Sequence, residues 1–400
     1  MSQRLISLRE KYLARWSTNA YKMEYNGFFS NHLLHGVTAI CELGASEKRV
    51  EEYGDHYTTK LCPVNKKQEV KSVALKEAKP LLGQRTNFEG LRAMYEDEIQ
   101  RLTVDGAVKK HLPTLVGGLA GSLLHGIIQL GYAYHVGGDL LIAEGLAYLH
   151  FSYLAFDDPN GEDSSEMEKV PFTREAAFKL VRRVRDDPKL LQELHTHLKE
   201  PAITKLSLGS LQPRVMSFSS DPVFGDRELF QAIASVVDSF DLADVDGDLA
   251  LDFISWLYLM VPQNDFVILH ATTSAWSLAQ VDHLLSAEDR LRAWKVWFRV
   301  ALSAYIAHEV PELPEADICV QSEAELPTLS SWEEIIANTL ALEGDVDEHV
   351  YKMVQVVHEH ATKAHQRKTS FLSEQEREYV MKKAAIKVIG EEFTIEVSST

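Results

Sequence analysis

The feature that most constrains the fold is a long stretch without any charged side chain, from Leu112 to Gly138. A helix of that length is long enough to cross a bilayer. The stretch also contains Pro113, His125, Gln129 and seven glycines, however, and the chain has no second stretch like it. We therefore expect a helical segment buried in the core of a large soluble protein, with no membrane partner.

Apolar residues recur at three- and four-residue spacing along much of the chain, which is the period of an amphipathic helix. Ser286 and the Ser330–Ser331 pair, each followed by acidic residues, have the composition of helix starts. We find no convincing run of alternating strand residues. The pattern predicts an all-α fold, a single helical domain over residues 1–400 with a short flexible tail at 390–400. Helices are predicted over 27–43, 88–102, 140–156, 174–184, 227–240, 266–278, 290–307 and 346–361.

Four glycines interrupt the charge-free stretch where a helix is expected: Gly117, Gly118, Gly121 and Gly126. Each costs about 1 kcal/mol relative to alanine inside a helix. Their presence predicts close approach of the backbone to a neighbouring element or ligand. His125 would then lie in a crowded interior.

Composition excludes several classes of partner. The net charge is -18, from 59 acidic and 41 basic side chains, so nucleic acid and anionic lipid surfaces would be repelled. The three cysteines, Cys41, Cys62 and Cys319, form no CxxC pair and are too few for a disulfide framework. The first residues contain no apolar signal segment. We expect a cytoplasmic protein.

Common catalytic and cofactor motifs are absent from the sequence. There is no GxGxxG, no P-loop, no GxSxG and no HExxH. The acidic run from Asp244 to Asp252 fails the EF-hand rule, because Leu249 stands at position six and Ser255 at position twelve. We interpret it as an acidic loop. His358 and His360 lie among charged residues and are expected on an exposed helix face.

Other histidines stand out because several lie where charge is scarce: His32, His35, His125, His270 and His349. A buried imidazole without a partner costs roughly 1 to 3 kcal/mol, so each needs a hydrogen bond or a metal. Taken singly, His125 and His270 are more often satisfied core residues than ligands. His32 and His35 are three apart, which on a helix places both rings over one face. They could share one ion, or one could support the other, or both could be surface residues.

Lys352 lies one helical turn after His349, on a face that it shares with Met353 and Val356. Its ammonium group could reach water past the helix edge. Alternatively, a desolvated lysine has a lowered pKa, becomes a neutral amine and can take up carbon dioxide as a carbamate. A carbamate would supply the carboxylate ligand that the histidines lack.

Four segments in order resemble the questin oxidase-like family, fungal polyketide-tailoring oxygenases and their wider relatives. They are 29–35 running into 41–46, 124–132, 269–274 and 347–352. The resemblance implies a largely helical single domain that opens rings of aromatic polyketides such as anthraquinones. It also implies a non-haem iron held by four histidines and a carbamylated lysine. Carried over residue by residue, the ligands are one of His32 or His35, then His125, His270, His349 and Lys352.

One position departs from the family, which often has a second histidine where this chain has Gln129. The departure bears on substrate contacts more than on the metal. We predict a helical bundle with a buried metal site, an Fe(II)-dependent oxygenase that acts on a phenolic or quinone-type ring with dioxygen. The predicted catalytic residues are His125, His270, His349 and Lys352, and the predicted substrate contacts are Gln129, Tyr132 and Trp276.

Two other functions fit parts of the pattern. A zinc or binuclear metal hydrolase can also use a carbamylated lysine, and a non-catalytic helical binding protein would have its histidines in the core. Descriptions of the family as Baeyer–Villiger-like imply NADPH, but the chain has no dinucleotide fingerprint. The electrons could instead come from the substrate.

Overall fold

The structure, a computed structural model, describes residues 3–15, 20–64, 70–157, 169–206, 211–308, 328–363 and 371–394. Within these ranges the protein is all-helical, as predicted, and its strands form three sheets of two short strands each. The helices of the first half are α1 (Gln3–Arg15), α2 (Leu33–Glu42), α3 (Glu47–Thr58), α4 (Leu75–Ala78), η2 (Lys79–Leu81), α5 (Phe88–Leu102), α6 (Val104–Leu115), η3 (Val116–Gly118), α7 (His125–Val136), α8 (Asp139–Phe151), α9 (Arg174–Arg185) and α10 (Pro188–His197). Those of the second half are α11 (Pro201–Thr204), α12 (Leu211–Ser217), α13 (Arg227–Asp238), α14 (Gly247–Met260), α15 (Phe266–Val281), η4 (Asp282–Leu284), α16 (Ala287–Ala307), α17 (Trp332–Leu340), α18 (Glu348–Thr362) and α19 (Glu374–Gly390).

Each pair of short strands holds two segments of the chain together. β1 (Glu24–Tyr25) and β2 (Phe29–Ser30) form an antiparallel hairpin directly before α2. β3 (Val170–Pro171) pairs with β4 (Phe240–Asp241), and β5 (Asn264–Asp265) pairs with β6 (Phe393–Thr394), both in parallel. The last pair ties the end of the described chain to the start of α15. Of the predicted tail, residues 395–400 lie outside the described ranges.

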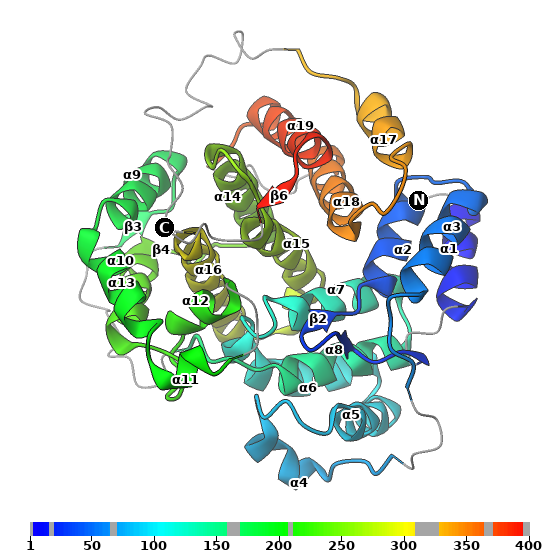
Figure 1. The fold of residues 1–400 in the computed structure, drawn as a ribbon, viewed down its shortest axis with the longest axis horizontal. Helices are drawn as coiled ribbons and strands as arrows, with labels where there is room; N and C mark the ends of the chain where they lie inside the picture. Colours follow the sequence, from blue (N-terminus) through cyan, green and yellow to red (C-terminus); the bar gives the residue numbers. More distant parts are fainter. Residues whose placement is uncertain are drawn as a thin grey trace.

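Four helices surround the centre of the molecule: α2, α7, α15 and α18 (Figure 1). α15 packs against both α7 and α18, and α2 packs against α7 and α18. Nearly every residue of α15 is buried, so this helix forms the middle of the hydrophobic core. Most residues of α2, α7 and α18 are buried as well.

Several helix boundaries agree with the sequence predictions. α5 has the predicted limits, and α16 and α17 begin after serine caps. Ser286 Oγ accepts a hydrogen bond from the Asp289 amide, and Ser331 forms a capping box with Glu334. These contacts satisfy amides that the first helical turn leaves free.

Two predicted helices were too long by five residues or more. Residues 27–32 of the helix predicted over 27–43 are not helical, because the β1–β2 hairpin occupies 24–30 and His32 is the N-cap residue of α2. Asn26 and Gly27 have positive φ values of 49° and 96°, which turn the hairpin and exclude a right-handed helix there. The helix predicted over 140–156 ends at Phe151.

The charge-free stretch from 112 to 138 is not one helix. α6 and η3 end in a left-handed turn in which Ser122, Leu123 and Leu124 have φ values of 49°, 51° and 68°, and α7 begins at His125. The predicted close approach is confirmed: a Cβ on Gly121 would lie 1.7 Å from the Ser152 carbonyl oxygen. Among the described helices, none combines the length and apolarity that crossing a bilayer requires.

The acidic run at 244–252 was wrongly predicted as a loop throughout. Its second half belongs to α14, where Asp252 is fully buried and pairs with Arg377 at 2.7 and 2.8 Å. His360 was expected to be exposed but is 1% exposed, and its Nε2 lies 2.8 Å from Asp252 Oδ1. Asp252 and His360, which the sequence pattern places at the surface, thus belong to a buried polar network that joins α14, α18 and α19. Cys41 and Cys62 are free thiols, and Cys319 lies outside the described ranges.

Candidate metal centre

Four imidazoles from four parts of the chain meet at one point. His32, His125, His270 and His349 are each at most 6% exposed, and their potential ligand atoms all lie within 4.8 Å of one another. The Nε2 atom of His125 is 2.6 Å from that of His32 and 3.2 Å from that of His270. The Nε2 atoms of His270 and His349 are 3.0 Å apart. Of the two candidates His32 and His35, it is His32 that lies in this cluster.

The four rings sit near the amino ends of the four central helices. His32 is the N-cap residue of α2, His125 is the first residue of α7 and His349 is the second residue of α18. His270 lies one turn into α15. Helix N-termini carry partial positive charge, so their convergence disfavours protonated imidazoles, and a cation held at this point would favour an anionic ligand beside it.

The other ring nitrogen of each histidine faces an oxygen acceptor. His125 Nδ1 contacts the Ser122 carbonyl, and His270 Nδ1 is 2.6 Å from the Phe266 carbonyl. The remaining two face acidic residues at the start of α18: His349 Nδ1 is 2.6 Å from Asp347 Oδ1, and His32 Nδ1 is 2.9 Å from Glu348 Oε1. Each ring therefore donates its N–H outward and presents its Nε2 lone pair to the cluster.

This arrangement fits a metal ion. Burial is the largest cause that lowers the pKa of all four imidazoles below the ordinary value, so they are neutral and their lone pairs are free. Four converging lone pairs repel unless a cation lies between them. His–metal bonds of about 2.0 to 2.1 Å would place adjacent nitrogens roughly 3 Å apart, close to the observed spacing. The centre can therefore hold a metal ion through four imidazoles.

Lys352 lies beside these rings without reaching water. The side chain is 0% exposed, which rules out an ammonium group at the helix edge. Among the described residues its Nζ has no hydrogen-bond partner. Burial lowers the pKa of the amine, and its charge in turn contributes to the lowered pKa of every histidine in the cluster. A fully buried amine without a partner is costly, and covalent modification or a ligand would relieve that cost.

Three supporting residues were not found by sequence reasoning: Asp347, Glu348 and Tyr57. The Tyr57 hydroxyl accepts a hydrogen bond from the His32 backbone amide at 2.9 Å. Glu348 is 9% exposed, and burial followed by the charge of Asp347 raises the pKa of its carboxyl. Asp347 also caps α18 by accepting the His349 amide at 2.9 Å. The sequence signal available for two of these residues was the segment 347–352, which resembles the family and contains Asp347 and Glu348.

His35 lies next to the cluster and is occupied elsewhere. Its ring centroid is 5.4 Å from that of His32, and its Nε2 donates to Gln129 Oε1 at 2.8 Å. Among the described residues, neither His35 Nδ1 nor Gln129 Nε2 has a hydrogen-bond partner. The pair thus offers one acceptor and one donor in the interior beside the metal centre.

Tyr132 packs against His35, and Trp276 packs against Tyr132. The Tyr132 ring is 4.9 Å from the His35 ring and 4.7 Å from the Trp276 ring. Tyr132 donates to Gln355 at 2.8 Å, and the Trp276 indole donates to Glu359 at 3.0 Å. Both side chains are at most 2% exposed, and their polar atoms are paired within the protein. Their role as substrate contacts stays a prediction.

The fold and the cluster together define an all-helical protein with a buried four-histidine centre that can hold a metal ion. Residues 29–357 of 400 match the questin oxidase-like family, so the chain belongs to that family. Membership places the protein among the oxidoreductases. The match includes all four histidines of the cluster and Lys352. No curated protein shows significant similarity to the chain.

Proposed function

We propose that the protein is a non-haem Fe(II)-dependent oxygenase that oxidises or cleaves a phenolic or quinone-type ring with dioxygen. The observation that carries this proposal is the convergence of four outward-donating, neutral imidazoles around a point next to a fully buried lysine. Imidazole nitrogens suit ferrous iron. Bound iron would supply the redox chemistry that brings dioxygen and an electron-rich ring to react.

Lys352 is proposed as the fifth ligand, in the form of a carbamate. Burial lowers the pKa of the Lys352 amine to about 8, and its deprotonated form would add to the carbon of carbon dioxide and release one proton. The resulting carboxylate would meet three helix N-termini, which favour negative charge. Its single negative charge would also offset half the charge of a divalent ion that is otherwise surrounded by neutral ligands. We place Lys352 with His125, His270 and His349 in the catalytic group.

The remaining side chains would orient the ligands and exclude water. Asp347, Glu348 and two backbone carbonyls fix the ring tautomers, so the lone pairs are aimed before a metal binds. The chain has no dinucleotide fingerprint, and we therefore propose a reaction without bound NADPH. Incorporation of both oxygen atoms into the product takes all electrons from the ring.

Metal analysis of protein purified without added metal tests this proposal. We expect iron at close to one ion per chain, and dioxygen uptake when a hydroxyanthraquinone is added. Zinc at full occupancy with no iron, together with no dioxygen uptake, would instead support a carbamate-dependent hydrolase.

A comparison of alanine variants tests the rival in which the histidines only fill the core. His270→Ala and His349→Ala should lose metal, while the control His35→Ala should keep it because His35 lies outside the cluster. Unchanged metal content in the first two variants would favour a non-catalytic helical protein.

A further inference from the structure

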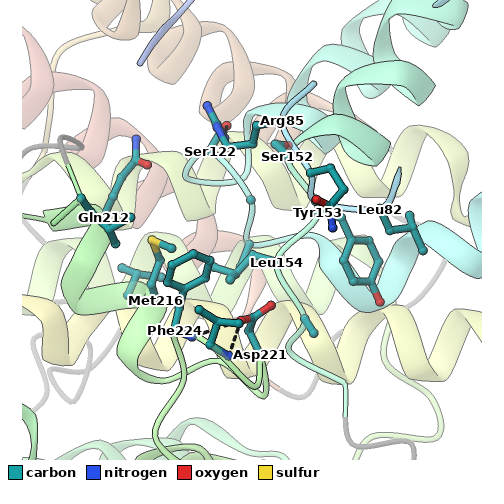
Figure 2. Close-up of a pocket in the computed structure, with 18 of the residues that line it drawn as sticks. Leu82, Arg85, Ser122, Ser152, Tyr153, Leu154, Gln212, Met216, Asp221 and Phe224 are labelled. Carbon is teal, nitrogen blue, oxygen red and sulfur yellow. Dashed lines mark hydrogen bonds between the residues drawn. The ribbon is translucent and has the colours of Figure 1, made fainter. Parts of the chain in front are cut away.

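The metal centre is almost closed to solvent. Its four histidines are at most 6% exposed, so a molecule larger than water reaches the point between them only if a covering segment moves. A cavity of about 610 Å³ lies behind the turn that precedes His125, but its lining includes no histidine of the cluster (Figure 2). The lining of a second cavity, of about 940 Å³, includes none either. Neither cavity therefore opens onto the centre.

Two sides of the centre are closed by residues of firmly held elements. Tyr57 lies in α3 and Glu348 in α18, and both contact His32. Ser122 lies in the turn directly before α7 and contacts His125 through its carbonyl. Moving any of these residues would deform a helix or the turn from which a histidine of the cluster projects.

The side formed by His270 and His349 is closed by two phenylalanines. The Phe266 ring centroid is 4.4 Å from that of His270 and 4.8 Å from that of His349. The Phe393 ring packs against Phe266 at 5.6 Å and against His349 at 6.3 Å. Both phenylalanines are half-buried, so they lie between the two imidazoles and solvent.

Phe393 belongs to β6, which returns from the end of α19 to the centre of the molecule (Figure 1). β6 consists of two residues and pairs in parallel with β5. Asn264 Nδ2 in β5 adds a hydrogen bond to the Glu391 carbonyl at 2.7 Å. The segment 391–394, which we call the cover, is held by this strand pair, this hydrogen bond and the packing of Phe393. Opening so short a segment costs far less than unfolding a helix.

The cover begins where the anchoring of α19 ends. Lys387 Nζ donates to two carbonyls at the end of α14 at 2.8 and 2.5 Å, which fixes the last turn of α19. Beyond it, Glu391 and Glu392 are exposed, and a Cβ on Gly390 would meet nothing within 4 Å. Rotation of the backbone at 390–392 would therefore move Phe393 without disturbing the helix.

We propose that the cover opens about Gly390 and so controls the passage of molecules to the metal centre. When it is closed, Phe393 packs on Phe266 and His349 and excludes water; when it is open, the side of the centre at His270 and His349 is accessible. This inference needs the metal centre but not the reaction proposed for it. The residues that match the family end at 357, so the match does not include α19 or the cover.

The rates at which Co(II) enters and leaves the full chain test this inference. Co(II) is a first-row divalent ion that follows Fe(II) in affinity for nitrogen ligands, and its visible absorbance reports binding. Association is measured by stopped-flow mixing with metal-free protein, and release by mixing loaded protein with EDTA. A cover alters only the barrier to passage, so removing it changes both rates by the same factor.

Phe393→Ala should therefore raise both rates about tenfold or more and leave the Kd unchanged. Phe393→Leu keeps an apolar side chain over the ring and should stay close to the wild type. The matched control is Phe178→Ala, because Phe178 is a half-buried phenylalanine of α9 that packs against Trp256 at 6.3 Å. Its rates should equal those of the wild type.

Hydrogen exchange of the metal-free wild type gives a second measurement. The amides of 391–394 should exchange about tenfold or more faster than those of 380–388 in α19, because the cover opens without the helix. Amides of the cover that exchange as slowly as those of α19 would overturn the inference.

A faster release of Co(II) from Phe393→Ala with an unchanged association rate would mean that Phe393 only positions His349, and would also overturn it. Unchanged rates in Phe393→Ala, or an equal increase in Phe178→Ala, would do the same. Failure of the wild type to bind Co(II) would refute the metal centre and the cover with it. These measurements do not involve dioxygen, so the oxygenase proposal can fail while the cover is upheld.

Discussion

Substitution of Asp347 tests how the metal centre is built, because one of its carboxylate oxygens contacts both the ring and the backbone amide of His349. Asp347 Oδ1 lies 2.6 Å from His349 Nδ1 and accepts the His349 backbone amide at 2.9 Å. The first contact sets the tautomer and orientation of a proposed ligand, and the second caps α18. Asp347→Ala removes both, whereas Asp347→Asn keeps an oxygen in place and removes the charge.

Because Asp347 has these two roles, its removal should lower two separate quantities, the metal affinity and the stability of the fold. Removing the partner of a metal-bound histidine typically lowers metal affinity 10- to 100-fold, or about 1.4 to 2.8 kcal/mol. Removing an N-cap costs about 1 kcal/mol of stability even without metal. Asp347→Ala should therefore show both losses. Asp347→Asn should lose less than about tenfold in affinity and little stability, because a neutral acceptor is weaker than a carboxylate but has the same position.

Metal affinity is measured by anaerobic competition between Fe(II)-loaded protein and a chelator, and stability by urea unfolding of the metal-free protein. The control is Asp187→Ala, which removes a similar cap on α10, where Asp187 accepts the Lys189 amide at 3.0 Å. It should lose stability without losing metal affinity. If Asp347→Ala bound iron as tightly as the wild type, the argument that outward hydrogen bonds aim the four lone pairs would be refuted.

Other substitutions test the lysine, the buried ion network and the turn. Added bicarbonate should raise the metal affinity of the wild type but not of Lys352→Met, which should bind about tenfold or more weakly; an equal response would exclude the carbamate. Arg377→Met should lower the free energy of unfolding in urea by about 3 to 5 kcal/mol with metal affinity retained, because it removes the guanidinium that pairs with both oxygens of the buried Asp252 carboxylate. The pKa of Asp252 lies below its ordinary 3.8, so its stabilisation is present above that pH and should be lost as the pH falls below it, as thermal melts across pH would show. Gly121→Ala should cost about 1 to 3 kcal/mol because its Cβ has no room, whereas Gly390→Ala, with nothing within 4 Å, should be close to neutral in the same melts.

Local patterns were enough to predict the helical class and many boundaries. The three- and four-residue spacing of apolar side chains reports which face of a segment is buried, and caps such as Ser286 and Ser331 report where a helix starts. The glycines before His125 also predicted a close approach, which Gly121 and Ser152 show. The spacing and the caps depend on neighbours within a few residues, and the glycines themselves indicate a close approach without naming the partner, which is why these features can be predicted from the sequence.

The convergence of the four histidines depends on contacts between segments that lie far apart in the sequence. Nothing near His32 or His35 indicates which ring turns toward His125, because that is decided by the β1–β2 hairpin and by Glu348 more than 300 residues away. Asp252 and His360 appeared to be surface residues until α19 brought Arg377 against them. From the sequence alone the chain was determined to be helical, rich in candidate ligands and similar in four segments to one family. Only the tertiary structure decided which candidates share a site, since their spacing in space is set by the packing of α2, α7, α15 and α18.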